Sequence, residues 1–177
     1  MMVILQEPQQ ANREMFIAAI QASQPLHQPW VNPPKTPEAF GAYFLRYQQD
    51  NQKSYWVIEE ASGALVGVFN LNEIVRGVFQ NAFMGYYAVS PHQGKGYMNA
   101  GLKLVLQKAF GELGLHRLEA NIQPENKASI ELVRRNGFRL EGYSPRYLKI
   151  NGVWSDHERW AITAEDCLGS ESCQLLA

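Results

Sequence analysis

The stretch NAFMGYYAVSPHQGKGYMN, residues 81–99, joins a strand-like run to a glycine turn. Its first half is rich in aromatic and aliphatic residues. Its second half places Gly94, Lys95 and Gly96 just before a long segment of helical apolar periodicity. Such a turn before a helix is typical of phosphate binding, because the first N–H groups of a helix lack intrahelical partners and the helix dipole favours an anion. The stretch therefore predicts a strand, a phosphate-binding turn and a helix in succession.

Two common phosphate motifs do not fit this turn. A P-loop, GxxxxGK[ST], would need a glycine in place of Val89 and a serine or threonine in place of Gly96. A dinucleotide fingerprint, GxGxxG, would need a third glycine in place of Asn99. The glycines could also serve only to reverse the chain, so the wider sequence has to decide.

Composition indicates one ordinary globular domain. The chain has 177 residues, 46% of them hydrophobic, and a formal net charge of -1. This balance gives no reason to expect nucleic-acid or membrane binding. No apolar run approaches the ~20 residues that span a bilayer, and the N-terminus lacks the build of a secretion signal. We expect a cytoplasmic protein, either a monomer or a homodimer.

The two cysteines, Cys167 and Cys173, lack the Cys-x2-Cys spacing of zinc sites. No metal site is therefore expected, and both thiols are expected to be reduced.

The segment order predicts the fold class. Helical stripes occupy the regions around 15–20 and 40–47, with a proline-rich irregular connection between them and Thr36 as an N-cap. Strands are predicted at 54–60, 64–75 and 83–89, then a helix, a strand at 116–122, a helix capped by Asn126, and strands at 139–150 and 153–162. The prediction is an α+β, three-layer domain over residues 1–166 with a flexible tail at 167–177. Its mixed, mainly antiparallel sheet of six to seven strands carries helices on both faces and a parallel pair at the centre.

The motifs around the turn resemble the GNAT acetyltransferase superfamily. They are QGKG after YYAV, Asn126 three residues before Ser129, and NGF at 136–138. Further runs resemble the RimJ/RimL type of ribosomal-protein alanine N-acetyltransferases, and RimJ most closely: NEIVRG, HQGKGYM, NKAS, RNGFRLEGY, YLKINGVWSDH and Pro29–Trp30. The likeness covers about residues 26–162 and departs from the Q/R-x-x-G-x-G/A motif at Met98.

This resemblance implies acetyl-CoA as the cofactor. Backbone amides of the turn would hold its pyrophosphate, and the pantetheine arm would lie along the strand before the turn, where two parallel strands splay apart. The N–H of Val89 would then donate to the thioester carbonyl as an oxyanion donor. The implied cofactor-binding residues are Tyr87, Ala88, Val89, Gln93, Gly94, Lys95, Gly96, Tyr97, Met98, Asn126 and Ser129.

The resemblance also implies direct attack of an amine on the thioester, which needs an acid for the departing thiolate. The tyrosine that many members use is replaced by Val133, so Ser129 is the expected acid, or else only a helix-start serine bonded to backbone. The glutamate of RimL-type enzymes is replaced by Leu148. The remaining candidate bases, each more often a surface or turn residue than a base, are Glu73, which ranks first, Asp156, which ranks second, Glu119, Glu141, His116 and His157.

The expected acceptor is the N-terminal α-amine of a protein, such as a ribosomal protein. Its pKa of ~7.7–8.0, against ~10.4 for lysine, means that it needs little help from a base, and a water chain could suffice. Trp30, Tyr43, Tyr147 and Trp154 would line the acceptor cleft or else pack in the core. Two alternatives remain open: acetylation of a small amine (a polyamine, an amino acid or an antibiotic), and a non-catalytic CoA-binding module.

Overall fold

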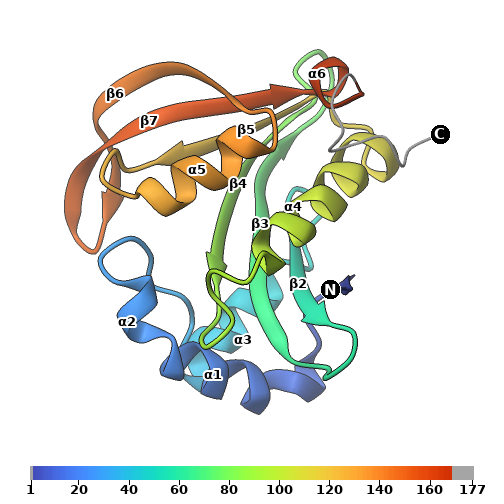
Figure 1. Cartoon of the computed structure of the whole chain (residues 1–177), viewed down its shortest axis with the longest axis vertical. Helices are drawn as coiled ribbons and strands as arrows, with labels where there is room; N and C mark the ends of the chain where they lie inside the picture. The colour runs from blue at the N-terminus through green and yellow to red at the C-terminus, as the bar shows by residue number, and fades with distance from the viewer. Residues whose placement is uncertain (1, 169–177) are drawn as a thin grey trace.

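The computed structural model describes residues 2–168 of the chain (Figure 1). Its strands are β1 Val3–Gln6, β2 Lys53–Glu59, β3 Leu65–Val75, β4 Asn81–Ala88, β5 Arg117–Ile122, β6 Arg139–Ile150 and β7 Val153–Thr163. Its helices are α1 Arg13–Ala22, α2 Gln24–His27, α3 Pro37–Arg46, α4 Tyr97–Gln107, α5 Lys127–Arg135 and α6 Ala164–Leu168. A 3-10 turn at Gln10–Asn12 precedes α1, and a π-helical turn at Lys108–Glu112 extends α4.

The strands form one seven-stranded sheet in the order β1-β2-β3-β4-β5-β7-β6. All neighbouring strands are antiparallel except β4 and β5, which are parallel and joined through α4. This confirms the predicted mixed sheet with a central parallel pair. A further strand, β1, for which the sequence analysis gave no residues, pairs with β2 from Val3 to Gln6.

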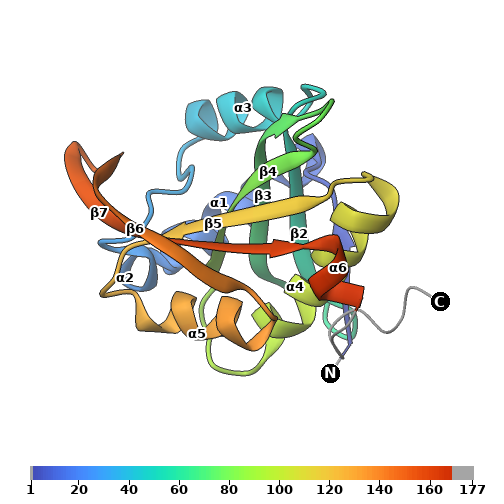
Figure 2. The ribbon, with the colours of Figure 1, turned by 90° about the horizontal axis from the view of Figure 1, so that it is seen from above.

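Helices cover both faces of the sheet, as the sequence predicts (Figure 2). On one face α1 and α3 bury Phe16, Ile20 and Phe40 against Trp56 of β2. On the other face the apolar side of α4 is buried against β2 and β3, and α5 contributes Val133. The burial of two helical layers against one sheet gives the three-layer architecture.

The two predicted N-caps are present. The Thr36 hydroxyl accepts a hydrogen bond from the N–H of Ala39 at 3.2 Å, at the start of α3. The Asn126 side chain accepts from the N–H of Ser129, also at 3.2 Å, at the start of α5. Both caps are local, so short polar residues at these positions were enough to place the helix starts.

The parallel pairing of β4 with β5 is short. It runs only from Asn81 opposite Arg117 to Phe83 opposite Glu119, although β4 continues to Ala88. Beyond Phe83 the two strands diverge, as Figure 1 shows. The sheet therefore has a central gap beside the last residues of β4, as the predicted splayed pair requires.

Two expectations about less regular regions need correction. The connection between the first two long helices is not wholly irregular, because residues 24–27 form the short helix α2 with Pro25 in its first turn. Cys167 and Leu168 belong to α6, although the predicted tail starts at 167; the remainder of that tail lies outside the described residues.

Cys167 is buried and disulfide-bonded, so the expectation of a reduced thiol is wrong for this residue. The argument from spacing tested only for zinc ligands and did not address a covalent bridge. Cys173 lies outside the described residues. No helix between residues 2 and 168 has the length and apolar character needed to cross a bilayer.

Candidate active site

The turn at the end of β4 has a backbone that only glycine adopts easily. Gly94 has φ +75° and Gly96 φ +86°, both in the left-handed region. Gly96 stands immediately before α4, whose first N–H groups have no intrahelical acceptors. These free amides and the positive end of an eleven-residue helix suit an anion such as a pyrophosphate.

The first turn of α4 is fixed by two side chains. The Tyr97 hydroxyl donates a hydrogen bond to the Glu59 carboxylate at the end of β2. The Met98 side chain packs over Gly67 of β3, where an added Cβ would lie 2.2 Å from the Met98 Sδ. Met98, where the sequence departs from the family motif, therefore packs its side chain against β3 and keeps its backbone amide in the first turn of α4.

A cleft of about 440 Å³ opens beside this turn and the gap between β4 and β5. It brings together ten of the predicted site residues: Trp30, Tyr87, Ala88, Gln93, Gly94, Gly96, Tyr97, Met98, Asn126 and Ser129. Val89, Lys95, Glu73, Tyr147, Trp154 and Asp156 are not part of its lining.

The expected oxyanion donor is wrong. The N–H of Val89 donates to the carbonyl of Val66 on β3 at 3.0 Å, so it is not free for a thioester. Hydrogen-bonding directions alternate along an antiparallel strand, so the polar groups of Tyr87 also face β3, whereas those of Tyr86 and Ala88 face the gap. The N–H at this strand end that faces the gap is therefore that of Ala88, one residue earlier.

Ser129 lies at the start of α5, on the α5 side of the cleft. Its N–H is held by Asn126, and its carbonyl accepts a hydrogen bond from the Tyr86 hydroxyl at 3.0 Å. Burial raises the pKa of Tyr86, so this phenol stays protonated. The backbone of Ser129 is therefore fixed from two sides at the edge of the cleft.

Glu73 does not reach the cleft. It sits in a bulge of β3, with φ +50°, next to the residues that pair with the start of β4. Its carboxylate accepts from the Gln52 amide at 3.0 Å and lies 3.9 Å from the Arg46 guanidinium. The turn at residues 90–96 follows the opposite end of β4, whose last residue, Ala88, lies five residues or about 17 Å beyond Phe83 at 3.3 Å per residue.

Asp156 is engaged within the β6–β7 hairpin. It accepts hydrogen bonds from the Tyr143 hydroxyl and from the N–H of Arg146 at 2.7 Å. These bonds, that from Tyr143 first, hold the pKa of the Asp156 carboxyl below its usual value. Arg146 has φ +49° and lies in a register shift of β6, so Asp156 stabilises that bulge.

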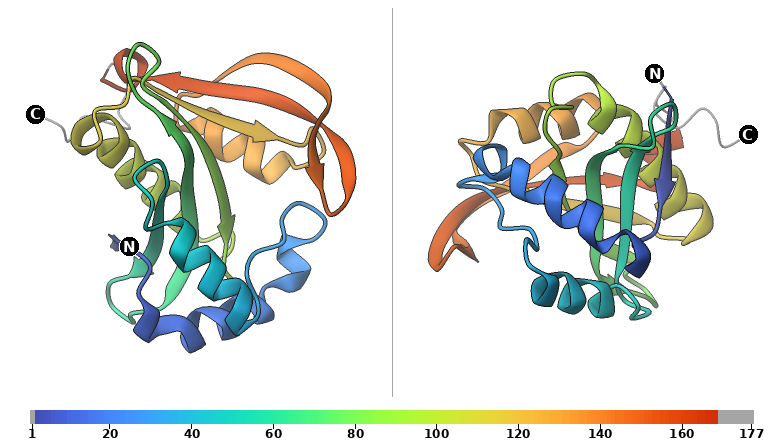
Figure 3. Two further views of the ribbon diagram at one scale, coloured as in Figure 1. Left: turned by 180° about the vertical axis from the view of Figure 1, so that it is seen from behind. Right: turned by 90° about the horizontal axis from the view of Figure 1, so that it is seen from below.

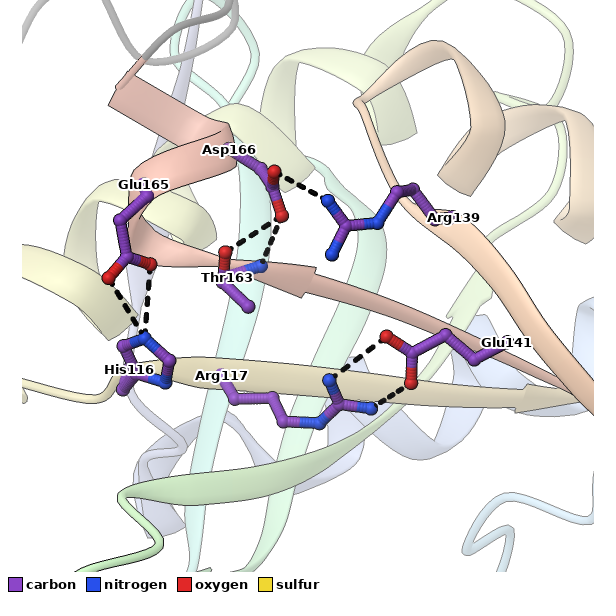
Figure 4. Close-up of polar contacts among 7 residues, drawn as sticks. All are labelled: His116, Arg117, Arg139, Glu141, Thr163, Glu165 and Asp166. Atoms are coloured by element: carbon purple, nitrogen blue, oxygen red, sulfur yellow. Dashed lines mark hydrogen bonds and ion pairs between the residues drawn. The ribbon is translucent and has the colours of Figure 1, made fainter.

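The remaining candidate bases also have structural partners. Figure 4 shows Arg117 paired with Glu141 and His116 paired with Glu165, near α6 and the β7 end that leads into it. Glu119 accepts from Arg117 at 2.9 Å. His157 is 2% exposed, and its Nδ1 lies 2.9 Å from the Ser155 carbonyl.

The four aromatic candidates for the acceptor cleft divide between core and surface. Tyr43 is buried, and its hydroxyl bonds Ser54 and the indole of Trp56, so the packing alternative holds for it. Tyr147 and Trp154 are 37% and 58% exposed on the β6–β7 hairpin, and Trp30 lines the cleft.

The loop after α2 bridges one edge of the cleft. The Asn151 amide at the hairpin turn donates to the Pro29 carbonyl at 3.0 Å, and the Gln123 amide after β5 donates to the Trp30 carbonyl at 3.5 Å. Figure 3 shows this loop meeting the end of the hairpin. The two bonds form an arch of residues 29–30 between the hairpin and β5.

Sequence reasoning missed several residues that line the cleft, among them His27, Tyr86, His92 and Arg135. Tyr86 could have been found from strand alternation, because it lies on the opposite face from Tyr87. His27 gave no signal: it lies in the proline-rich connection, 61 residues before its hydrogen-bond partner Ala88.

Comparison with known proteins decides the family. A family model described as an acetyltransferase (GNAT) domain matches residues 3–139. The chain belongs to the GNAT acetyltransferases. The structure superposes on Mycobacterium smegmatis RimJ, solved in complex with CoA-disulfide, with a TM-score of 0.87 and 26% identity, covering 98% of this chain and 87% of that one.

Curated relatives agree with this assignment. The probable N-acetyltransferase YjcK of Bacillus subtilis is 39% identical over 70% of this chain and 68% of its own length. The [ribosomal protein uS5]-alanine N-acetyltransferase of Escherichia coli is 39% identical over 58% of this chain, and the match spans about half, 53%, of that enzyme. The spermidine N(1)-acetyltransferase of Vibrio cholerae is 29% identical over 67% of this chain.

The protein is an acetyl-CoA-dependent N-acetyltransferase, and the site fits that cofactor. The left-handed glycine turn and the free amides of α4 match its pyrophosphate, while the gap beside β4 offers backbone N–H and C=O groups to its amide-containing arm. When bound, acetyl-CoA supplies an activated acetyl thioester. The glycine turn and the end of β4 are the parts of the protein that would hold and orient it.

Proposed function

We propose that the protein acetylates the α-amine of a protein N-terminus, beginning with alanine or serine, in a ternary complex with acetyl-CoA. The observation that carries the proposal is the arch of residues 29–30, bonded to both the hairpin turn and the end of β5. A cleft bridged in this way favours a slender acceptor that enters end-on, as a chain terminus does. Internal lysines of folded proteins are surrounded by bulkier surfaces.

The charges of the cleft favour a peptide over a polyamine. Glu131 is the one carboxylate among its lining residues, and it is already paired with Arg134 and Arg135 at 2.5 and 2.6 Å. A polyamine carries several ammonium groups and needs free carboxylates to replace their hydration. The hairpin beside the arch instead exposes Tyr147 and Trp154, which suit contacts with a peptide.

The functions for which two relatives are named bear on the class of acceptor. The Escherichia coli relative is named for the alanine of ribosomal protein uS5. The Vibrio cholerae relative is named for spermidine, which keeps a small amine as the second candidate. A ribosomal-protein terminus as acceptor would place the reaction in the cytoplasm.

The proposed chemistry needs only one protein acid. The neutral amine nitrogen attacks the thioester carbonyl, the C–S bond breaks, and the Ser129 hydroxyl gives its proton to the departing thiolate. The Ser129 oxygen then takes a proton back from solvent, so the enzyme returns to its starting state. The proton released by the amine passes to solvent, since neither Glu73 nor Asp156 lines the cleft. An α-amine with a pKa of ~7.7–8.0 is substantially neutral near pH 7.5, so this route is adequate for an N-terminus and poor for lysine.

The test is a comparison of kcat/KM at pH 7.5 among peptides that begin with Ala or Ser, the same peptides blocked by an N-terminal acetyl group but carrying an internal lysine, and spermidine. The proposal expects the free α-amine peptides to react fastest. Their advantage should narrow as pH rises towards the lysine pKa. Equal or higher kcat/KM for spermidine would replace the proposal with the small-amine alternative.

A further inference from the structure

The end of β4 offers few polar groups to the gap. Val89 bonds back to Val66, and the register places Val68 opposite Tyr87, so the groups of Ala88 point away from β3. On that side β5 has already diverged, since its last residue paired with β4 is Glu119. Without another partner, both the N–H and the C=O of Ala88 would face the gap.

His27 is hydrogen-bonded to one of these two groups, the Ala88 carbonyl. Its Nε2 lies 2.8 Å from the Ala88 carbonyl oxygen. A carbonyl only accepts hydrogen bonds, so Nε2 must carry the proton. The His27 ring is 3% exposed and makes an edge contact with the Tyr87 ring, at 5.2 Å between centroids.

The other ring nitrogen indicates a neutral imidazole. His27 Nδ1 is buried and has no hydrogen-bond partner among the described residues. Burial lowers the pKa of His27, against the smaller opposing effect of the Ala88 carbonyl. A proton on Nδ1 would be a buried, unpaired donor, so the ring is held as the Nε2–H tautomer.

A second bond from the same helical region fixes the strand end. The Ser23 hydroxyl, between α1 and α2, accepts from the N–H of Ser90 at 2.9 Å and donates to the Ala19 carbonyl at 2.7 Å. Ser90 follows Ala88 by two residues, so two side chains hold the strand end from one side. The peptide plane of Ala88 is therefore set by α2.

We propose that His27 is a positioning residue that fixes Ala88 so that the Ala88 N–H donates a hydrogen bond to the acetyl carbonyl of the cofactor. By occupying the Ala88 C=O, it leaves the N–H as the polar group that Ala88 presents to the gap. That N–H fits an acceptor, which the thioester carbonyl is. As the amine attacks and the carbonyl oxygen gains negative charge, the fixed N–H stabilises it without reorganisation.

The test compares His27→Phe, which keeps a ring and loses the donor, with His27→Gln, which keeps an N–H donor on a flexible stem. His116→Gln, near α6 and outside the cleft lining, is the control. The readout is the infrared stretching frequency of the carbonyl of [1-¹³C]acetyl-CoA bound to each protein. This measurement needs no acceptor amine, so its outcome is independent of the proposed N-terminal substrate.

The proposal expects the bound carbonyl of the wild type and of the control to absorb at lower frequency than free acetyl-CoA. The shift should be lost in His27→Phe and largely restored in His27→Gln. With any amine that the wild type acetylates, kcat should fall by about 10- to 100-fold in the Phe variant, somewhat less than removal of an oxyanion donor costs, with little change in acetyl-CoA affinity. An unchanged frequency in a folded Phe variant would overturn the proposal, as would a Gln variant no better than Phe.

A measurement on the wild type covers the case in which the Phe variant does not fold. Long-range ¹H–¹⁵N correlation spectra of the histidine-labelled protein report which ring nitrogen carries the proton. The proposal requires His27 to be the Nε2–H tautomer at pH 7.5. An Nδ1–H tautomer, or a doubly protonated ring, would contradict it.

Discussion

A single negative charge in the glycine turn should weaken acetyl-CoA binding by electrostatics alone. Gly94 has φ +75°, and a Cβ added there would meet no atom within 4 Å. A side chain therefore fits at this position, and the strain it causes comes only from the left-handed backbone conformation. Asn and Asp tolerate that region better than other residues and have nearly the same shape. Gly94→Asn and Gly94→Asp therefore share their strain and differ by one charge.

The size of the difference follows from Coulomb's law. A carboxylate about 5 Å from a pyrophosphate with two negative charges costs about 1.7 kcal/mol in a water-like medium, or about a 15- to 20-fold higher Kd. Lower local polarity would enlarge this figure, and physiological salt reduces it, because the Debye length is about 8 Å. We expect Gly94→Asp to bind acetyl-CoA at least about tenfold more weakly than Gly94→Asn at low salt.

Isothermal titration calorimetry at low and high salt measures both effects. Gly77 provides the matched control: it has φ +73°, an added Cβ would meet no atom within 4 Å, and it lies in the β3–β4 turn at the other end of β4. Gly77→Asp should leave acetyl-CoA affinity unchanged. If Gly94→Asp and Gly94→Asn bind acetyl-CoA equally at low salt, the pyrophosphate does not lie at this turn.

Three further predictions concern catalysis, packing and pH. Ser129→Ala should lower kcat by about 10²-fold with little change in acetyl-CoA affinity, if thiolate protonation limits the rate. An unchanged kcat, measured where the chemical step is rate-limiting, would mean that Ser129 has only a structural role. Gly101→Val should reduce the free energy of unfolding, measured by urea denaturation, by about 1–3 kcal/mol, because even a Cβ would lie 2.7 Å from Val57 Cγ2. Gly41→Ala is the control: an added Cβ would meet no atom within 4 Å, so this variant should be as stable as the wild type or more stable. The lowered pKa of Asp156 means that its stabilisation is present above the unfolded value near 3.8 and is lost as pH falls through the folded pKa. The stability difference between wild type and Asp156→Asn should therefore be seen at pH 7 and disappear at strongly acidic pH, and a pH-independent difference would contradict the assignment.

The features that the sequence predicted best depend on neighbours in the chain. The glycine turn, the caps Thr36 and Asn126 and the Asn151–Gly152 hairpin each involve residues within a few positions of one another. Local geometry restricts them strongly, so composition and spacing suffice. The mixed sheet with one central parallel pair could be predicted because a strand–helix–strand unit among hairpins leaves few topologies.

Glu73 was ranked first as a base, but it does not line the cleft, because of the register between β3 and β4. Glu73 is on the strand next to the cofactor strand, but it lies near the β3–β4 turn, where β4 begins. The glycine turn follows the end of β4, so adjacency of strands did not imply adjacency of side chains. Counting residues from the turn would have shown this.

The contacts of His27 could not be predicted in the same way. Its hydrogen bond to Ala88 joins segments 61 residues apart, and it depends on how α2 sits against the end of β4. The N–H of Val89 points to β3 and that of Ala88 to the gap, because hydrogen-bond direction depends on the pairing register of β3 with β4. Neither the packing of a short helix nor a strand register is encoded in a local motif.

A competition experiment compares the three kinds of acceptor amine in one reaction. A single reaction at pH 7.5 contains acetyl-CoA, spermidine and a peptide with a free N-terminal alanine and one internal lysine, and tandem mass spectrometry locates the acetyl group at early time points. We predict acetylation of the alanine α-amine ahead of both the lysine and spermidine. At acetyl-CoA concentrations well below both Kd values, the Gly94→Asp protein should react at least about tenfold more slowly than the Gly94→Asn protein. Preferential acetylation of spermidine or of the lysine side chain would contradict it.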